Sequence, residues 1–266
     1  MPIVTLLEKV YGSFSVEAFE SVFSSLCRGL RVGLRVVGKT DRGWVRVEVS
    51  GEDETVALRY LDREVGLAPV SVEGLKKFSA VRGRVVSCGE GEDRLCVDIG
   101  VFSPRVCDAV VPLKSLRARL ADGKGFSFRQ MAELFCLCDN LPVRVKVVGG
   151  LEAGERCVEA ELSEFQVCQF GRWVRSGLDR LLVLGALFSD VERAVYASGH
   201  ARDVVGVESL GLLEHVVVCK LGTFAVGLVS GFGRFLSGAI LLPFCPRKIE
   251  EFVDREFFFF GGPGRT

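Results

Sequence analysis

The sequence has few of the residues on which acid–base and metal chemistry usually depend. Among its 266 residues only two are His, and these, His200 and His215, fall on separate predicted elements. The ten Cys include no Cys-x-x-Cys spacing, which argues against a zinc site. No GxGxxG, GxSxG or HExxH motif occurs. We therefore predict a protein that binds rather than catalyses, with no catalytic residue, metal or cofactor.

Net charge and long apolar runs are also lacking. Lys plus Arg and Asp plus Glu both number 34, so a polyanion would have to meet a local basic patch. The most apolar region, 221–246, is interrupted by Arg234, and neither side supplies the roughly 20 apolar residues of a membrane-spanning helix. Glu8 and Lys9 break the opening apolar run, which argues against a secretory signal. We expect a cytoplasmic protein with no membrane contact.

Free cysteines are most often small buried hydrophobes, and we favour this interpretation for the close pair Cys136 and Cys138. A disulfide or a reactive thiol pair is the alternative, because some intracellular proteins do carry disulfides.

Apolar periodicity and turn residues divide the chain into three predicted modules. The first, residues 1–78, is expected to fold as βαββαβ, with a helix opening near Ser15, a second helix over 52–65, and strands at 3–10, 30–37, 43–49 and 69–72. The third, residues 163–266, repeats that order with strands at 180–184, 203–208, 215–221 and 239–242, and ends in a helical, Phe-rich tail at 257–260. Capping-box patterns at Ser163 and Ser189 mark two of its helix starts.

The middle module, residues 79–162, has a different pattern. It contains five short predicted strands, with helical material between the third and fourth, at 81–88, 94–99, 109–113, 143–148 and 157–162. This is the layout of an OB barrel. Glycines stand where a closing barrel bends most, at Gly83, Gly89, Gly91 and Gly100. The predicted fold class is therefore α+β, an OB β-barrel flanked by two ferredoxin-like βαββαβ modules.

Three segments of this middle module follow a familiar pattern: 82–86 (RGRVV), 97–100 (VDIG) and 108–113 (DAVVPL). In them the module resembles the S-one type of OB domain, an RNA-binding barrel. Segments 177–181, 198–205 and 211–223 resemble an uncharacterised archaeal family, the domain-of-unknown-function family twenty-one-ten. This second resemblance implies an archaeal source and an S-one-like core, and it supplies no activity. Phe224 and Val226 depart from the family pattern, which has Asp and Pro there.

A basic patch on the barrel is the leading candidate for nucleic-acid binding. Arg82 and Arg84 alternate with small or apolar residues, as do Arg144 and Lys146, and the first and fourth strands of an OB barrel are neighbours. These four cations are therefore expected to form one outward patch that meets phosphates. A second basic group in the helical insertion includes Lys114 and Arg117. The alternative is an ordinary solvated face balanced by nearby acids.

The N-terminal sheet offers another patch. Alternation places Trp44 and Arg46 on the side away from the Val core, and Arg31 and Arg35 across the hairpin are expected to share that face. The alternative is a Trp that packs against the neighbouring module. Within the barrel only Phe102 lies near the usual stacking positions, which favours recognition of RNA shape or backbone, or of a protein, over single-stranded sequence.

The C-terminal module holds a possible anion-binding corner. His200, Arg202 and Lys220 approach the expected helix start after Thr223, where backbone N–H groups attract negative charge. The alternative is a local cap with salt bridges.

These features favour a non-catalytic RNA-binding or ribonucleoprotein-binding protein. By analogy of fold its partner would be the archaeal translation or transcription machinery, that is, a ribosome or an RNA polymerase complex. The alternative is a small-molecule-sensing regulatory protein that uses an ACT-like C-terminal module. An enzyme acting on RNA comes last, because no residue constellation supports it. The oligomeric state is left open.

Overall fold

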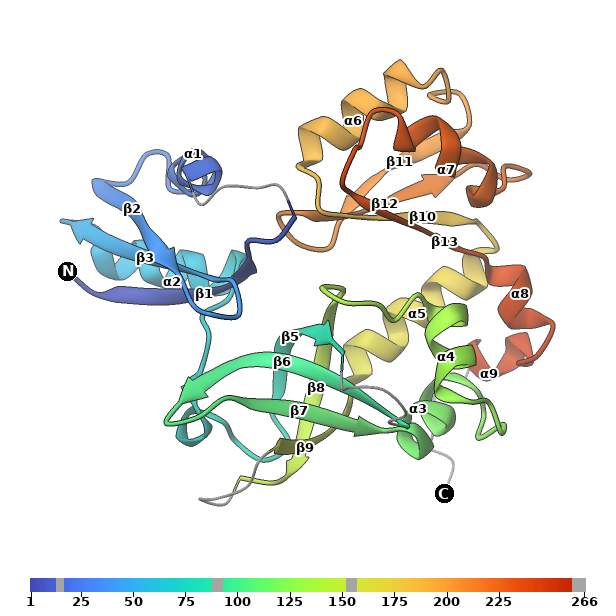
Figure 1. Cartoon of the computed structure of the whole chain (residues 1–266), viewed down its shortest axis with the longest axis horizontal. Coiled ribbons are helices and arrows are strands. Elements are labelled where there is room, and N and C mark those ends of the chain that lie inside the picture. The colour runs from blue at the N-terminus through green and yellow to red at the C-terminus, as the bar shows by residue number, and fades with distance from the viewer. Residues whose placement is uncertain (13–16, 88–92, 152–156, 260–266) are drawn as a thin grey trace.

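The protein has a mixed α+β architecture, seen in a computed structural model that describes residues 1–12, 17–87, 93–151 and 157–259 (Figure 1). Its strands form a three-stranded, a six-stranded and a four-stranded sheet. Among the described residues no helix is long and apolar enough to cross a membrane. The predicted features at Ser15, Gly89, Gly91 and Phe260 lie outside the described residues.

The N-terminal module is an antiparallel sheet in the order β1-β3-β2 with two helices packed against it. Its elements are β1 (Ile3–Lys9), α1 (Glu17–Leu26), β2 (Val32–Lys39), β3 (Trp44–Gly51) and α2 (Glu54–Glu64). The alternating pattern of β3 buries Val45, Val47 and Val49, as predicted, and Phe19 and Phe23 of α1 pack in the same core.

The predicted fourth strand of this module pairs elsewhere. β4 (Val70–Ser71), which is followed by the 3₁₀ turn η1 (Val72–Gly74), lies parallel to β6 of the barrel, with Val70 opposite Val101. Only an isolated bridge between Leu6 and Leu67 continues the N-terminal sheet. The chain leaving α2 crosses the edge of β1 for too short a distance to form a full strand there before it reaches the barrel.

The central part is a closed five-stranded β-barrel. Its strands are β5 (Ala80–Val86), β6 (Arg94–Ser103), β7 (Cys107–Pro112), β8 (Pro142–Gly149) and β9 (Cys157–Leu162). They pair in the order β6-β5-β8-β9-β7, and β7 also pairs with β6, which closes the ring. The insertion between β7 and β8 folds into α3 (Leu113–Leu120) and α4 (Phe128–Phe135). The predicted helical material between the third and fourth strands is confirmed.

Two glycines permit the close approach of segments that the barrel requires. A Cβ atom at Gly83 would lie 2.6 Å from the backbone oxygen of Asp98 on the next strand. Gly100 has φ +76°, and a Cβ atom there would lie 2.7 Å from Cβ of Ala68 in the N-terminal module. Both contacts are shorter than van der Waals distance, so only Gly fits either position without a shift of the backbone.

The C-terminal module is a four-stranded antiparallel sheet in the order β11-β12-β10-β13. The elements, preceded by α5 (Glu164–Ser176), are β10 (Arg180–Leu184), α6 (Phe188–Ala197), β11 (Val204–Ser209), β12 (Glu214–Cys219), α7 (Ala225–Gly233) and β13 (Ile240–Phe244). In Figure 1, α6 and α7 lie on one side of this sheet and α5 on the other. β10 is therefore buried on both faces, with Leu181 and Val183 in one core and Leu182 and Leu184 in another.

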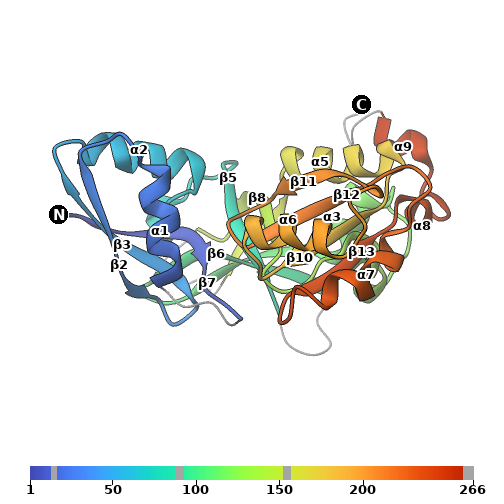
Figure 2. The ribbon, with the colours of Figure 1, turned by 90° about the horizontal axis from the view of Figure 1, so that it is seen from above.

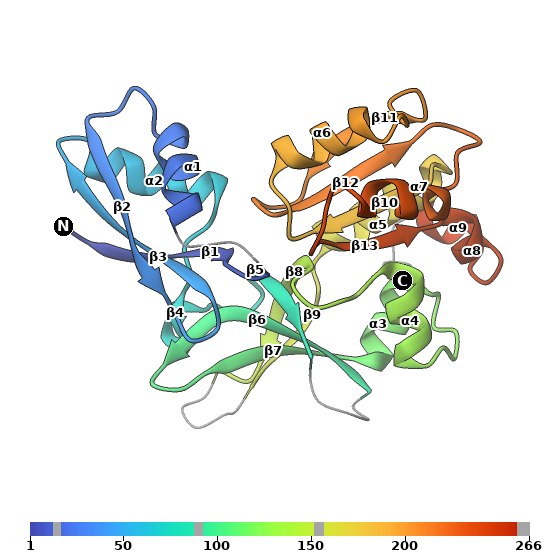
Figure 3. The ribbon, with the colours of Figure 1, turned by 45° about the horizontal axis from the view of Figure 1, so that its top comes forward.

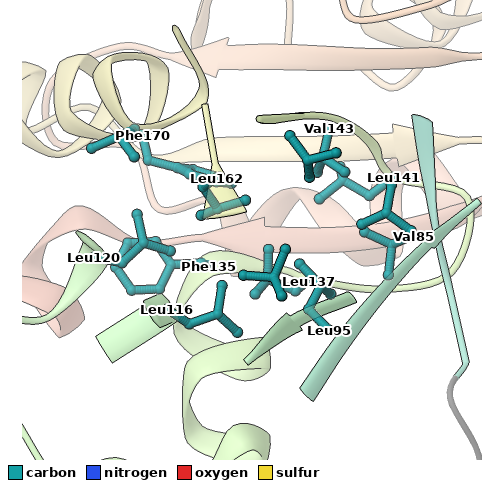
Figure 4. Close-up of a cluster of buried hydrophobic side chains, with 14 of the residues drawn as sticks. Val85, Leu95, Leu116, Leu120, Phe135, Leu137, Leu141, Val143, Leu162 and Phe170 are labelled. Atoms are coloured by element: carbon teal, nitrogen blue, oxygen red, sulfur yellow. The ribbon is translucent and has the colours of Figure 1, made fainter. Parts of the chain in front are cut away.

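Helix α5 joins the barrel and the C-terminal sheet in one continuous core (Figure 4). The Phe170 ring on α5 lies 5.5 Å from the Phe135 ring on α4, and Trp173 lies 5.3 Å from Phe244 on β13. Leu213, just before β12, inserts into the N-terminal core. The modules are therefore packed together, with the N-terminal and C-terminal modules at opposite ends (Figure 2).

The last elements of the described residues are α8 (Pro246–Glu250) and α9 (Arg255–Phe259), which pack on α5. Phe258 is buried in the core shared by the barrel and α5, beside Gly171. Burial of a Phe side chain contributes about 2 kcal/mol. The described part of the Phe-rich tail thus covers α5 rather than the α6 and α7 side of the C-terminal module.

The two predicted capping boxes have different outcomes. The helix start at Ser163 is confirmed, because Ser163 is the N-cap of α5 and its hydroxyl oxygen accepts a hydrogen bond from the Gln166 N–H at 3.3 Å. The reciprocal half of the box is absent, because Oε1 of Gln166 accepts from the Arg144 N–H at 3.0 Å. The second prediction is wrong, because α6 begins at Phe188, its N-cap is Leu187, and no side-chain cap is present.

Candidate functional site

A buried charge cluster lies where the three modules meet. Arg84 on β5 forms ion pairs with Glu8 of β1 and with Glu214 of β12. Its side chain is only 3% exposed. The Tyr11 hydroxyl donates a hydrogen bond of 2.5 Å to Oε1 of Glu214. The predicted outward position of Arg84 is wrong, because the flanking modules cover this end of β5 and supply two carboxylates to its guanidinium.

The cluster has one more negative charge than positive when both carboxylates are ionised. Burial raises the pKa of Glu8 to about 7; Arg84 opposes this effect and Glu214 reinforces it. Burial alone would lower the pKa of Arg84, but its pairing with Glu214 and Glu8 raises it instead. Burial and the adjacent Glu214 also raise the pKa of Tyr11. Protonation of Glu8 makes the buried cluster neutral.

A cleft of about 640 Å³ opens beside this cluster and is lined by all three modules. Strands β5 and β8 form one wall. The N-terminal module contributes β1, α1 and the end of α2, and the remaining lining comes from the starts of α5 and α6, the segment between β11 and β12, and β12 itself. Figure 3 shows the N-terminal and C-terminal modules on either side of β5 and β8. The lining side chains with polar, charged or aromatic groups include Arg82, Arg144, Phe165, Phe188 and His215.

Two arginines of the predicted patch face each other in this cleft. Arg82 and Arg144 are direct cross-strand partners on β5 and β8. Among the described residues neither forms an ion pair with a carboxylate, although the charge of Arg82 lowers the pKa of the nearby Glu8. Burial and the nearby Arg82 both lower the pKa of Arg144, as expected for a like charge without a counter-ion. Their predicted proximity is confirmed.

Each of these arginines is held by an uncharged contact. Arg82 donates to the backbone oxygens of Arg63 and Glu64 at 3.2 and 3.4 Å, at the end of α2 where carbonyl groups attract cations. The Arg144 guanidinium lies 4.0 Å from the ring centroid of Phe165. Neither contact neutralises the positive charge, so the pair can still bind an anion.

Aromatic side chains from outside the barrel complete the cleft. Phe165 at the start of α5 is 47% exposed, and Phe188 at the start of α6 is 39% exposed. The Phe188 ring packs on the buried His215 ring, with centroids 5.6 Å apart and ring planes at 72°. Burial lowers the pKa of His215, whose Nε2 donates to the oxygen of Ala186 at 3.1 Å. His215 is therefore neutral at pH 7 and supports the Phe188 ring.

Sequence reasoning missed both phenylalanines because the predicted patch was confined to the barrel. A signal was present at Phe165. The buried residues Val167, Phe170 and Val174 define the apolar face of α5, and Phe165 lies off that face in a polar turn. An aromatic residue placed off the apolar face of its helix is left free to contact a neighbouring element, as Phe165 does with Arg144.

The other cations of the barrel prediction do not join the cleft. Lys146 forms a 2.9 Å ion pair with Glu161 on β9. Lys114 is exposed on α3, and on the same helix Arg117 donates to the backbone oxygen of Phe126 at 2.5 Å. The predicted four-cation patch is therefore reduced to the Arg82–Arg144 pair.

The predicted N-terminal patch is built differently from the expectation. Trp44 is buried, its Nε1–H donates to Asp98 of the barrel at 3.0 Å, and Lys9 lies 4.5 Å from its ring centroid. It is therefore a contact between modules, as in the alternative interpretation, and not an exposed stacking surface. The arginines of this patch are exposed: Arg31, paired with Glu52; Arg35, paired with Glu48; and Arg46.

In the C-terminal corner, the carboxylate of Asp179 occupies the position predicted for a bound anion. The first N–H of α7, that of Ala225, donates to a carboxylate oxygen of Asp179 at 3.1 Å. His200 contacts Asp203 at 2.9 Å. The sequence-predicted cations Arg202 and Lys220 are exposed, and Thr223 is half-buried. Because Asp179 occupies the helix start, the arrangement matches the local cap and salt-bridge alternative.

Two further patterns lie in settings that differ from those their usual chemistry requires. Residues 33–40 (GLRVVGKT) match the spacing of a phosphate-binding P-loop, but they run along β2 into a hairpin, whereas a P-loop joins a strand to a helix N-terminus. Cys136 and Cys138 are free thiols whose pKa burial raises to about 12, so both are protonated at neutral pH. Within the described segments no group of three or more His, Cys, Asp or Glu could hold a metal ion.

Comparison with known proteins gives three consecutive matches to family models. The N-terminal domain of DUF2110 matches residues 3–69, its central domain matches 77–174, and its C-terminal domain matches 178–242. No curated protein matches the chain. The central match includes most of α5, the helix whose apolar face packs in the same core as the barrel.

Proposed function

We propose that this chain, which belongs to the DUF2110 family, is a non-catalytic RNA-binding protein whose site is the cleft between its three modules. The Arg82–Arg144 pair carries the proposal. The two arginines stand opposite each other on neighbouring strands, their like charges interact, and neither forms an ion pair with a carboxylate among the described residues. Such a pair is electrostatically unfavourable alone and becomes favourable when a phosphate binds between the two groups.

The fold is compatible with this function. We assign the barrel to the S-one-like OB class, supported by its closed connectivity, in which β5 pairs with β8 and β7 runs parallel to β9. We assign the C-terminal module to the ferredoxin-like class, whereas the N-terminal module has only the first three strands of that arrangement, because β4 pairs with the barrel. The support is the βαββαβ order of the C-terminal module, whose first strand lies between its third and fourth. These likenesses raise the expectation of RNA binding, while the site itself rests on the cleft.

The test is binding of fluorescein-labelled single-stranded RNA, measured by anisotropy over a salt series. We expect the double variant R82A/R144A to bind about thirtyfold more weakly, because two half-exposed phosphate contacts contribute about 1 kcal/mol each. Its salt slope should fall by about 1.4, since each contact to a single strand contributes roughly 0.7.

The control is R129A/R193A, which removes the same charge from exposed, paired arginines outside the cleft and outside the predicted N-terminal patch. It should bind RNA like the unmodified protein. Melting temperatures of both variants show whether each remains folded. Equal RNA affinity for the two double variants would remove the cleft from the proposal.

The proposed partner assembly is a ribosome or an RNA polymerase complex, and its identity can be tested separately. Tagged protein isolated from its native cells at low salt, with and without nuclease, should lose ribosomal or polymerase components when the RNA is digested. A partner that survives nuclease would instead indicate a protein-docking role.

The small-molecule sensor has less support than RNA binding. Its expected ligand site, the helix start after Thr223, holds the carboxylate of Asp179. A thermal-shift screen of amino acids and nucleotides should show no stabilisation that depends on this corner.

A further inference from the structure

The size of the cleft suits a small ligand or a single nucleotide better than an RNA duplex. Its volume of about 640 Å³ lies within the range of pockets that enclose small molecules. Proteins recognise duplex RNA across its wide, shallow minor groove, whereas unpaired bases can turn out of a strand and enter a pocket. A recess formed by three modules therefore favours an unpaired nucleotide.

One wall presents a guanidinium plane suited to stacking. The Arg144 guanidinium packs against the Phe165 ring at 4.0 Å, and this contact restrains its orientation. Guanidinium planes, like aromatic rings, stack on RNA bases and do so without selecting one base over another. Arg144 therefore offers a flat cationic face within the cleft.

A second wall presents an aromatic ring. Phe188 comes from the C-terminal module, lines the cleft and keeps 39% of its surface exposed. The buried imidazole of His215 packs against it, so the ring is held in place at little conformational cost. Exposure of a supported Phe inside a recess is the arrangement expected for base stacking.

Arg82 keeps donors for a phosphate. A guanidinium has five N–H donors, and the contacts of Arg82 with Arg63 and Glu64 engage one from each terminal nitrogen. The remaining donors can bind a phosphate oxygen. Because Arg82 and Arg144 are direct cross-strand partners, a phosphate bound to Arg82 would lie next to the guanidinium group of Arg144.

We infer that the cleft takes one unpaired nucleotide of single-stranded RNA, with its base against Phe188 and the flat face of the Phe165-supported Arg144, and its phosphate between Arg82 and the N–H edge of Arg144. This inference rests on the proposed RNA-binding function and specifies the ligand of the same site. It also accounts for the scarcity of aromatic residues on the barrel itself, because the stacking groups come from α5 and α6.

The test compares a labelled single-stranded 12-mer RNA with the same RNA in a duplex, using the full chain. Single-stranded RNA should bind more tightly, and F188A should weaken its binding about thirtyfold while leaving the salt slope unchanged, because stacking releases no counterions. F188Y keeps an aromatic ring and should restore binding. F224A, the same truncation at an exposed Phe on the N-terminal side of α7, is the matched control and should bind normally.

The outcomes separate this inference from the function on which it rests. Absence of RNA binding by the unmodified protein would overturn both. Binding that depends on Arg82 and Arg144 but is equal for duplex and single strand, or is unchanged in F188A, would overturn the nucleotide site and leave the RNA-binding proposal in place. Loss of binding in F188A that F188Y does not restore, with both variants folded, would also count against stacking.

Discussion

The charge cluster at the module junction makes the stability of the protein depend on pH in a defined direction. Glu8 has an ordinary pKa of 4.5, which burial raises to about 7. A carboxyl group with a raised folded-state pKa contributes stability that is fully present below pH 4.5 and is lost as the pH rises through about 7. At about 1.4 kcal/mol per pKa unit, the shift corresponds to about 3 kcal/mol.

The variant E8Q isolates this effect, because Gln has the size of the protonated acid and cannot ionise. Relative to the unmodified protein, E8Q should have similar stability near pH 4.5 and greater stability at pH 8, by about 3 kcal/mol. For a chain of this size that difference corresponds to roughly 5–10 °C in melting temperature. Scanning calorimetry over pH 4.5–8 measures it as the difference between the two proteins, so contributions from other groups cancel.

E52Q is the matched control for this comparison. Glu52 is exposed and paired with Arg31, and surface pairs of this kind contribute at most about 1 kcal/mol. Its melting temperature should follow that of the unmodified protein at every pH. If E8Q were instead less stable than the unmodified protein at pH 8, the ion pair with Arg84 would outweigh the burial of Glu8, and the reasoning would be refuted.

Two substitutions test the contacts between and within the modules. G83A should destabilise the barrel by about 1–3 kcal/mol in urea denaturation, because the new methyl group would lie 2.6 Å from the Asp98 backbone oxygen; unchanged stability would show that β5 and β6 can separate at no cost. W44F should cost about 1–2 kcal/mol, because the buried Asp98 loses the hydrogen bond from the indole N–H; W44F with unaltered stability would mean that this hydrogen bond does not hold the N-terminal module to the barrel.

Local sequence pattern was sufficient to place most of the strands. The predicted strands at 157–162 and 180–184 coincide with β9 and β10, because alternation and apolar runs depend only on residues close in the chain. Gly83 and the helical insertion were predicted for the same reason. The proximity of Arg82 and Arg144 also followed from the sequence, once the expected barrel made their strands neighbours.

Contacts between modules could not be predicted from local sequence pattern. Glu8 and Lys9 interrupt an apolar run and look like surface residues, yet each is buried and paired with a barrel residue, Arg84 and Asp98 respectively. Trp44 is on the predicted face of its strand, but the barrel covers that face. In each case the partner lies far away in the sequence, so no local periodicity reports the burial.

Contacts between modules also explain why the two arginines of β5 have different surroundings. Arg82 and Arg84 stand two residues apart on β5 and so project to the same side of the sheet. The flanking modules bring Glu8 and Glu214 into ion pairs with Arg84, whereas the hydrogen bonds of Arg82 go to backbone oxygens. The Arg84 guanidinium therefore holds the modules together, while Arg82 lies beside Arg144 without an ion pair among the described residues. The junction therefore creates the proposed binding site by leaving one arginine of the strand without a paired carboxylate.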